Sequence, residues 1–160
     1  MKKRIIGIDP GLAHTGFGII DSENGKLSLL SYGVIETTSS DDHSLRLLSI
    51  YRRFYAILDE FQPNEAEMET LYFSRNASSA LAVAEAKGVL TLCLAEMGIP
   101  LSFYTPNQIK TSVTGSSSAD KKTVELYVKI LLNLKTEPKP DHAADALAGA
   151  ITHIHTNPQK

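Results

Sequence analysis

The chain has 160 residues, of which 42% are hydrophobic and 21% charged, and its formal net charge is −2. This composition argues against a disordered chain and predicts that residues 1–160 form a single domain with a proper hydrophobic core. The near-neutral charge weighs weakly against a nucleic-acid partner, so any such surface would depend on local clustering of basic residues.

The N-terminus and the single cysteine indicate where the protein works. Residues 2–4 resemble the basic start of a signal peptide, but the apolar run behind them is interrupted by Gly7 and stops at Asp9, which is too short for export. No stretch is expected to span a bilayer. Cys93 lies inside an apolar run and is expected to be a small buried hydrophobe. We therefore expect a cytoplasmic protein with no membrane partner.

The first third of the chain predicts three strands and a helix. Apolar runs and alternation indicate strands at 4–9, 15–21 and 27–37. The Asn-Gly pair at 24–25 is typical of a tight hairpin. Because the links are short, these strands are expected to form an antiparallel meander. Leucine and aromatic residues at helical spacing then predict a helix over 44–61.

The rest of the chain alternates strands with helices and then ends in helices. Pro106 is expected at the first position of its helix, and Ser118 is expected to cap the helix that follows it. The element order predicts an α/β fold, a five-stranded mixed sheet flanked by helices. The predicted strands are 66–70 and 100–104, and the predicted helices are 77–97, 106–113, 119–132 and 142–155.

Acidic residues end three widely separated apolar segments. Asp9 ends the first strand, Glu69 the fourth, and Asp145 lies in the first turn of the last helix. Grouped carboxylates repel one another and lose hydration unless a cation neutralises them. Carboxylates with one imidazole suit Mg²⁺ or Mn²⁺. If the fold brings these residues together, the chemistry is metal-dependent phosphoryl transfer, by a nuclease or a kinase.

Four motifs make the chain similar to one family over nearly its whole length: Gly-Ile-Asp-Pro-Gly at 7–11, Glu-Thr-Leu-Tyr-Phe-Ser-Arg-Asn at 69–76, His-Ala-Ala-Asp-Ala-Leu-Ala at 142–148 and Ile-Thr-His at 151–153. The chain resembles the RuvC family of bacterial Holliday junction resolvases. The resemblance implies a ribonuclease H-like fold, a homodimer, symmetric nicking of two strands of a four-way DNA junction, dependence on Mg²⁺ or Mn²⁺, and work with the RuvA and RuvB branch-migration proteins.

The resemblance also implies a set of catalytic and metal-binding residues, in which the third position needs a choice. Asp141 follows a proline and is expected to be the N-cap, with its carboxylate bonded to backbone N–H groups. His142 would then be the first helical residue, on the same face as Asp145. Histidine at this position could favour Mn²⁺ over Mg²⁺. The expected set is Asp9, Glu69, His142 and Asp145.

These residues would act with two metal ions on about a 4 Å spacing, which generate hydroxide and neutralise the leaving oxygen. Asp9 is expected to bridge the ions, because it ends the central strand. Glu69 and Asp145 would hold one ion or its water molecules, and His142 would be a ligand or position water.

DNA contacts are expected close to this set. Tyr72 and Phe73 could stack on unpaired bases, although core aromatics are as common. Lysines would bind the DNA backbone through counterion release, against the plain alternative of solvated surface. The helix at 77–97 is a candidate dimer interface, or simply a core helix. The expected DNA-binding residues are Tyr72, Phe73, Arg75, Lys110, Lys121 and Lys122.

Three other functions compete with junction resolution. The segment 9–16 resembles the phosphate loop of actin-like ATPases, but those proteins need two such domains and a longer chain. A related nuclease could cut RNA in place of DNA junctions. A junction-binding protein could have lost its activity through His142. Phosphate release from ATP, RNA cleavage, and binding without cleavage in either metal would identify the three.

Overall fold

The computed structural model describes residues 1–70 and 77–157, and its elements follow the predicted order. The Asn24–Gly25 hairpin forms as predicted, with both residues at positive φ. The strands are β1 (Lys3–Asp9), β2 (His14–Glu23), β3 (Lys26–Glu36), β4 (Glu65–Glu69) and β5 (Leu101–Tyr104). The helices are α1 (His43–Phe61), α2 (Ala77–Glu96), α3 (Pro106–Thr114), α4 (Lys121–Leu131) and α5 (Asp141–Thr156).

The strands form one mixed sheet in the order β3-β2-β1-β4-β5. The hairpin links make β1, β2 and β3 antiparallel, while β4 and β5 run parallel to β1. Parallel neighbours need crossover connections, which α1 and α2 supply. The central strand is therefore β1, as expected, and its last residue is Asp9.

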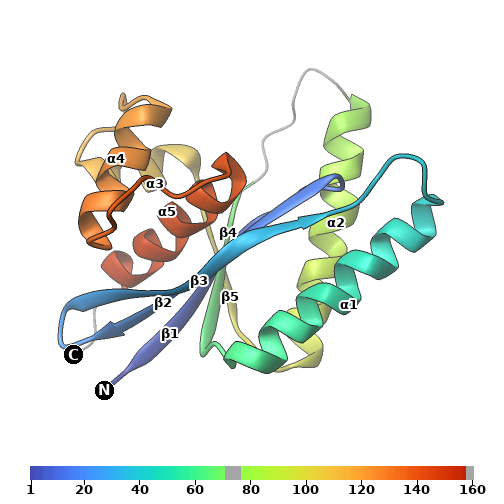
Figure 1. Ribbon diagram of the computed structural model, residues 1–160, viewed down its shortest axis with the longest axis horizontal. Coiled ribbons are helices and arrows are strands. Elements are labelled where there is room, and N and C mark those ends of the chain that lie inside the picture. The colour runs from blue at the N-terminus through green and yellow to red at the C-terminus, as the bar shows by residue number, and fades with distance from the viewer. Residues whose placement is uncertain (71–76, 158–160) are drawn as a thin grey trace.

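Helices cover both faces of the sheet and make two hydrophobic cores (Figure 1). Ile6 and Ile8 point toward α1 and α2, whereas Ile5 points toward α3, α4 and α5. Since side chains alternate along a strand, Asp9 shares the second face with Ile5. On β4, Met68 belongs to the first core, so Glu69 also faces α5.

The expectation that no stretch could span a bilayer is wrong for α2. By length and composition alone this helix could cross a membrane, although 22% of its apolar window is buried inside the protein. Its buried residues, which include Leu90 and Cys93, pack in the core with α1. Cys93 is fully buried, as predicted. The exposed side of α2 is also apolar, which is why the whole helix is long and apolar enough to cross a membrane.

Two helix starts also differ from the prediction. Asp120, not Ser118, caps α4, because its Oδ1 accepts from the backbone N–H of Thr123 at 2.8 Å. Asp141 is the first residue of α5 and makes no cap hydrogen bond; Pro140 occupies the N-cap position. By contrast, α3 begins at Pro106 as predicted, behind a capping box formed by Thr105.

Close approach of α5 to the sheet sets the position of its first turn. A Cβ on Gly7 would lie 1.9 Å from the backbone oxygen of Ala146, and one on Gly16 would lie 2.1 Å from that of His142. Only glycine permits these contacts. The start of α5 therefore lies directly on β1 and β2, beside the end of β1.

Candidate active site

Two carboxylates lie at the same edge of the sheet because their strands are parallel neighbours. β1 and β4 pair in register with Ile8 opposite Met68. The next residue of each strand is Asp9 and Glu69, both on the face that α5 covers. The end of a parallel sheet thus holds two acids side by side, far apart in sequence.

The first turn of α5 adds an imidazole and a third carboxylate. His142 Nδ1 lies 2.8 Å from Asp9 Oδ2. Asp145 follows one turn later on the same side, near enough to Asp9 and Glu69 to affect the pKa of each. The structure thus brings together all four residues predicted from the sequence.

The electrostatics of this group are unfavourable in the absence of a cation. Burial raises the pKa of Glu69 to about 7, and the charges of Asp9 and Asp145 add to the effect. Burial also raises the pKa of Asp9, although the hydrogen bond with His142 partly offsets this effect. Burial raises the pKa of Asp145 as well. Three acids resist ionisation together, which is the behaviour of a site that a cation completes.

Two of the three predicted lysines face these acids. Lys110 and Lys121 line a cavity of about 250 Å³ together with Glu69 and Asp145. Lys121 Nζ lies 3.5 Å from Asp145 Oδ2. Lys122 does not line this cavity and lies exposed at the start of α4.

The donor set fits a hard divalent cation, but the side chains are not arranged around one. Among the described residues, no three Asp, Glu, His or Cys side chains converge closely enough to hold one ion. The hydrogen bond between His142 and Asp9 and the ion pair between Lys121 and Asp145 occupy these groups instead. Both contacts lie at a partly exposed rim, where a cation can replace them.

The alternative third residue, Asp141, points to different partners. Its carboxylate lies 3.4 Å from Lys139 Nζ and 3.6 Å from Lys121 Nζ. These lysines lower its pKa, the charge of Lys121 most. Asp141 is thus a neutralised surface acid, whereas His142 contacts Asp9 directly. The predicted DNA contacts Tyr72, Phe73 and Arg75 lie outside the described residues.

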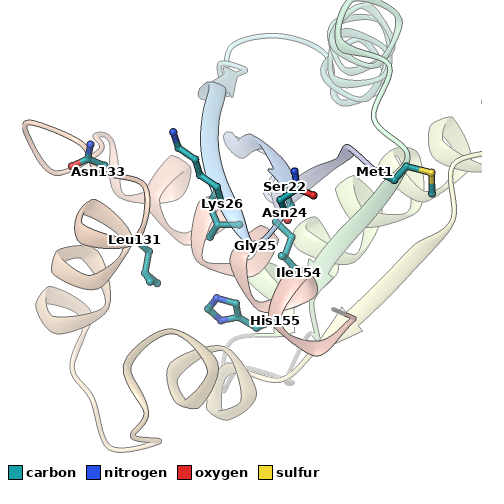
Figure 2. A pocket seen from close by; sticks show the side chains of 10 residues that line it. Met1, Ser22, Asn24, Gly25, Lys26, Leu131, Asn133, Ile154 and His155 are labelled. Carbon is teal, nitrogen blue, oxygen red and sulfur yellow. The ribbon is translucent and has the colours of Figure 1, made fainter. Parts of the chain in front are cut away.

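A second cavity, larger than the one beside the acids, lies away from them. It has a volume of about 800 Å³ and lies between the β2–β3 hairpin and the ends of α4 and α5 (Figure 2). Because Lys3 pairs with Ser22 and Asp9 with Gly16, this cavity is at the opposite end of β1 from Asp9. Its lining residues carry no acidic side chain.

One neighbour of the site was not predicted. The ring of His14, the first residue of β2, stacks on the ring of His142, with centroids 5.4 Å apart and planes 7° from parallel. A lone histidine at the start of a strand carries no sequence signal for this contact. Only the close packing of α5 on β2 creates it.

Comparison with known proteins is decisive about the family. The family model described as crossover junction endodeoxyribonuclease RuvC matches residues 5–153. The chain belongs to the RuvC family. The RuvC proteins of Treponema denticola and Treponema pallidum (strain Nichols) are each 48% identical to it, over 97% and 94% of this chain and 87% and 77% of theirs. T. thermophilus RuvC in complex with a Holliday junction substrate superposes with a TM-score of 0.93 at 34% identity, covering 96% of this chain and 94% of that one.

These findings confirm several predictions. The ribonuclease H-like fold, with its five-stranded mixed sheet, is that of RuvC. The chain is an endonuclease of the Holliday junction class. RuvC nucleases are metal-dependent. The actin-like kinase alternative is thereby wrong.

Proposed function

We propose that this RuvC-family chain resolves four-way DNA junctions by symmetric nicking at the site where β1, β4 and α5 meet. The observation that supports the site is that three carboxylates gather at this end of the sheet and that the pKa of each is raised. Such a group is stable as three anions only with a cation between them. The proposed catalytic and metal-binding residues are Asp9, Glu69, His142 and Asp145.

Each residue has a role that follows from its position. When bound, Mg²⁺ or Mn²⁺, proposed as two ions, would activate water and neutralise charge at the scissile phosphate. Asp9 contacts His142 of α5 and raises the pKa of Glu69 on β4, which supports a role for it in holding both ions. Glu69 and Asp145 face the cavity with the lysines and would hold one ion or its water. His142 would bind through a ring nitrogen or orient water.

The lysines of the cavity would contact the DNA backbone. Lys121 neutralises Asp145 in the free protein. A cation that binds Asp145 would release Lys121 to pair with a phosphate, which suits its place at the rim. Lys110 lines the same cavity. We also propose backbone contacts for Lys122 and Arg75, and base stacking for Tyr72 and Phe73.

We propose that the chain acts as a homodimer through the exposed side of α2. Leu81 and Leu92 are each 64% exposed there. They are eleven residues apart and therefore lie on the same side of the helix, with Ala84 and Gly88 between them. An apolar stripe with small residues packs well against a second helix, and two-fold symmetry suits a junction with two equivalent strands.

The remaining assignments follow from the substrate class. A bacterial DNA junction is a cytoplasmic substrate, so we propose a cytoplasmic location. We also propose RuvA and RuvB as partners, and residues 1–160 as a single nuclease domain.

The test is cleavage of a synthetic mobile four-way junction in Mg²⁺ and in Mn²⁺. Paired nicks on opposite strands are expected in at least one metal, and single-stranded RNA should stay intact. Binding without nicking in both metals would favour a junction-binding protein. Cleavage of the RNA alone would favour the RNA nuclease. Substitution of Leu92 by glutamate should shift the protein from dimer to monomer in light scattering.

A further inference from the structure

The contact between His14 and His142 is a stack of two flat rings beside the acids. The centroid separation and the small interplanar angle are those of a face-to-face contact. His142 Nδ1 contacts Asp9 at the same time. One imidazole therefore has a fixed neighbour at its edge and another against its face.

Local geometry on β2 explains why the stack forms. His14 and Gly16 lie on the same face of β2, since side chains alternate along a strand. The missing side chain at Gly16 lets the backbone of His142 reach that face. The ring of His142 then lies along β2 toward position 14. Thr15, between them, points the other way and is fully buried.

His14 has Glu36 as its neighbour on the opposite side. Its partner across the sheet is Glu36 of β3, and its Nε2 lies 3.8 Å from Glu36 Oε1. Four neighbouring side chains thus form a row across β3, β2, α5 and β1. In order, they are Glu36, His14, His142 and Asp9.

We propose that His14 is a positioning residue, which restricts the imidazole of His142 to a plane in which its Nδ1 edge faces Asp9, where the proposed cation would bind. This inference rests on the proposed role of His142. A ring that is free to rotate about χ1 and χ2 has to be ordered each time a ligand binds, whereas a stacked ring is ordered beforehand. Within the described residues, His14 makes no hydrogen bond or ion pair with Asp9, Glu69 or Asp145, so it would act through His142.

The test compares His14→Ala with His14→Phe. Phenylalanine keeps a flat ring for stacking, and alanine removes it. His14→Ala is expected to weaken Mn²⁺ binding, measured by calorimetry on the DNA-free protein, and to lower the single-turnover nicking rate, each about tenfold. His14→Phe is expected to recover most of both losses. His155→Ala, on an exposed histidine at the far end of α5, is the control and should change neither.

A double-mutant cycle separates this inference from the proposed function. In a His142→Ala background, His14→Ala is expected to have no further effect on Mn²⁺ affinity, since the two act in series. If His142→Ala weakens Mn²⁺ binding but His14→Ala does not, the positioning role is wrong and the site stands. If His142→Ala leaves Mn²⁺ binding unchanged, the proposed role of His142 is wrong, and the positioning role with it. Equal losses in His14→Phe and His14→Ala would also overturn the positioning role.

Discussion

The two ends of α5 meet two glutamates of one strand in opposite ways. Glu65 and Glu69 lie on the same face of β4, and both face α5. Glu65 Oε1 lies 2.6 Å from Lys3 Nζ, and Glu65 Oε2 lies 2.5 Å from His153 Nε2. Glu69 instead faces Asp9 and Asp145. At one end of α5, Glu65 has basic partners, whereas at the other end Glu69 lies near two further acids.

The pKa values record the difference. Burial acts to raise the pKa of Glu65, but hydrogen bonds from Lys3 and His153 outweigh it and lower the pKa overall. At Glu69 burial and two like charges act together, and the pKa rises to about 7. An ionised glutamate on this face of β4 therefore stabilises the fold at position 65 and destabilises it at position 69. Such local cost is typical of functional sites, and the proposed cation would offset it here.

The largest effect should come from Asp9→Asn, which tests whether the acidic end is catalytic. Asparagine keeps the size and the contact with His142 but removes the charge. Junction nicking should fall by about a hundredfold or more, while junction binding, measured by gel shift, should change little. A loss of binding equal to the loss of nicking would make Asp9 a structural residue.

The next largest effect should come from His142→Ala, which we compare with a substitution of its neighbour Asp141 at the start of α5. His142→Ala should lower the nicking rate about tenfold to a hundredfold, whereas Asp141→Ala should lower it only slightly. Because Asp141 makes no cap hydrogen bond, its removal should cost only its exposed ion pairs with Lys121 and Lys139 and its interaction with the helix dipole, so the unfolding free energy should change little. The reverse ranking in single-turnover assays would give Asp141 the catalytic role.

The two ends of α5 also differ in how far the sequence predicts them. Asp9, Glu69 and Asp145 each end an apolar segment, so strand order and one helix were enough to bring them together. His153 and Tyr104 contact each other with an Nδ1 to Oη distance of 3.0 Å, yet nothing in their spacing predicts that pair.

Contacts that depend on side-chain direction or on close packing were missed for the same reason. The cap of α4, the ion pairs that Asp141 makes in place of a cap, and the His14 stack depend on the exact path of loops and on glycine contacts between α5 and the sheet. Hydrophobic periodicity predicts elements and faces, but it does not specify which side chains meet across them.

A third prediction concerns the paired end. Glu65→Gln should lower the unfolding free energy at pH 7 by about 2 kcal/mol, because Lys3 and His153 lose a charged partner. Since the folded pKa of Glu65 is lowered, its contribution is present above the unfolded pKa and disappears as the pH falls through the folded value. The gap between wild type and variant in urea titrations should therefore close in acid. Nicking should be unchanged, and Glu60→Gln, on the exposed side of α1, should alter neither property.

The smallest effect should be a gain in stability from Glu69→Gln without metal. The folded pKa of about 7 exceeds the unfolded value of 4.5, so wild type loses stability as the pH rises between the two, where the unfolded chain ionises first. The variant avoids this loss. It should be equal to wild type below pH 4.5 and more stable at pH 8 by about 1 kcal/mol, a figure reduced because the group is partly exposed.

Metal should reverse that ranking. On the proposed function, Mg²⁺ or Mn²⁺ would bind the ionised site and stabilise the folded wild type, whereas Glu69→Gln would lack one proposed ligand. Saturating metal at pH 8 should therefore raise the thermal midpoint of wild type well above that of the variant. Because the metal displaces a proton from Glu69 below pH 7, its apparent affinity for wild type should rise between pH 6 and pH 8 and should rise less for the variant. Equal pH dependence in both proteins would mean that Glu69 does not bind the ion, and that its raised pKa is only a consequence of burial.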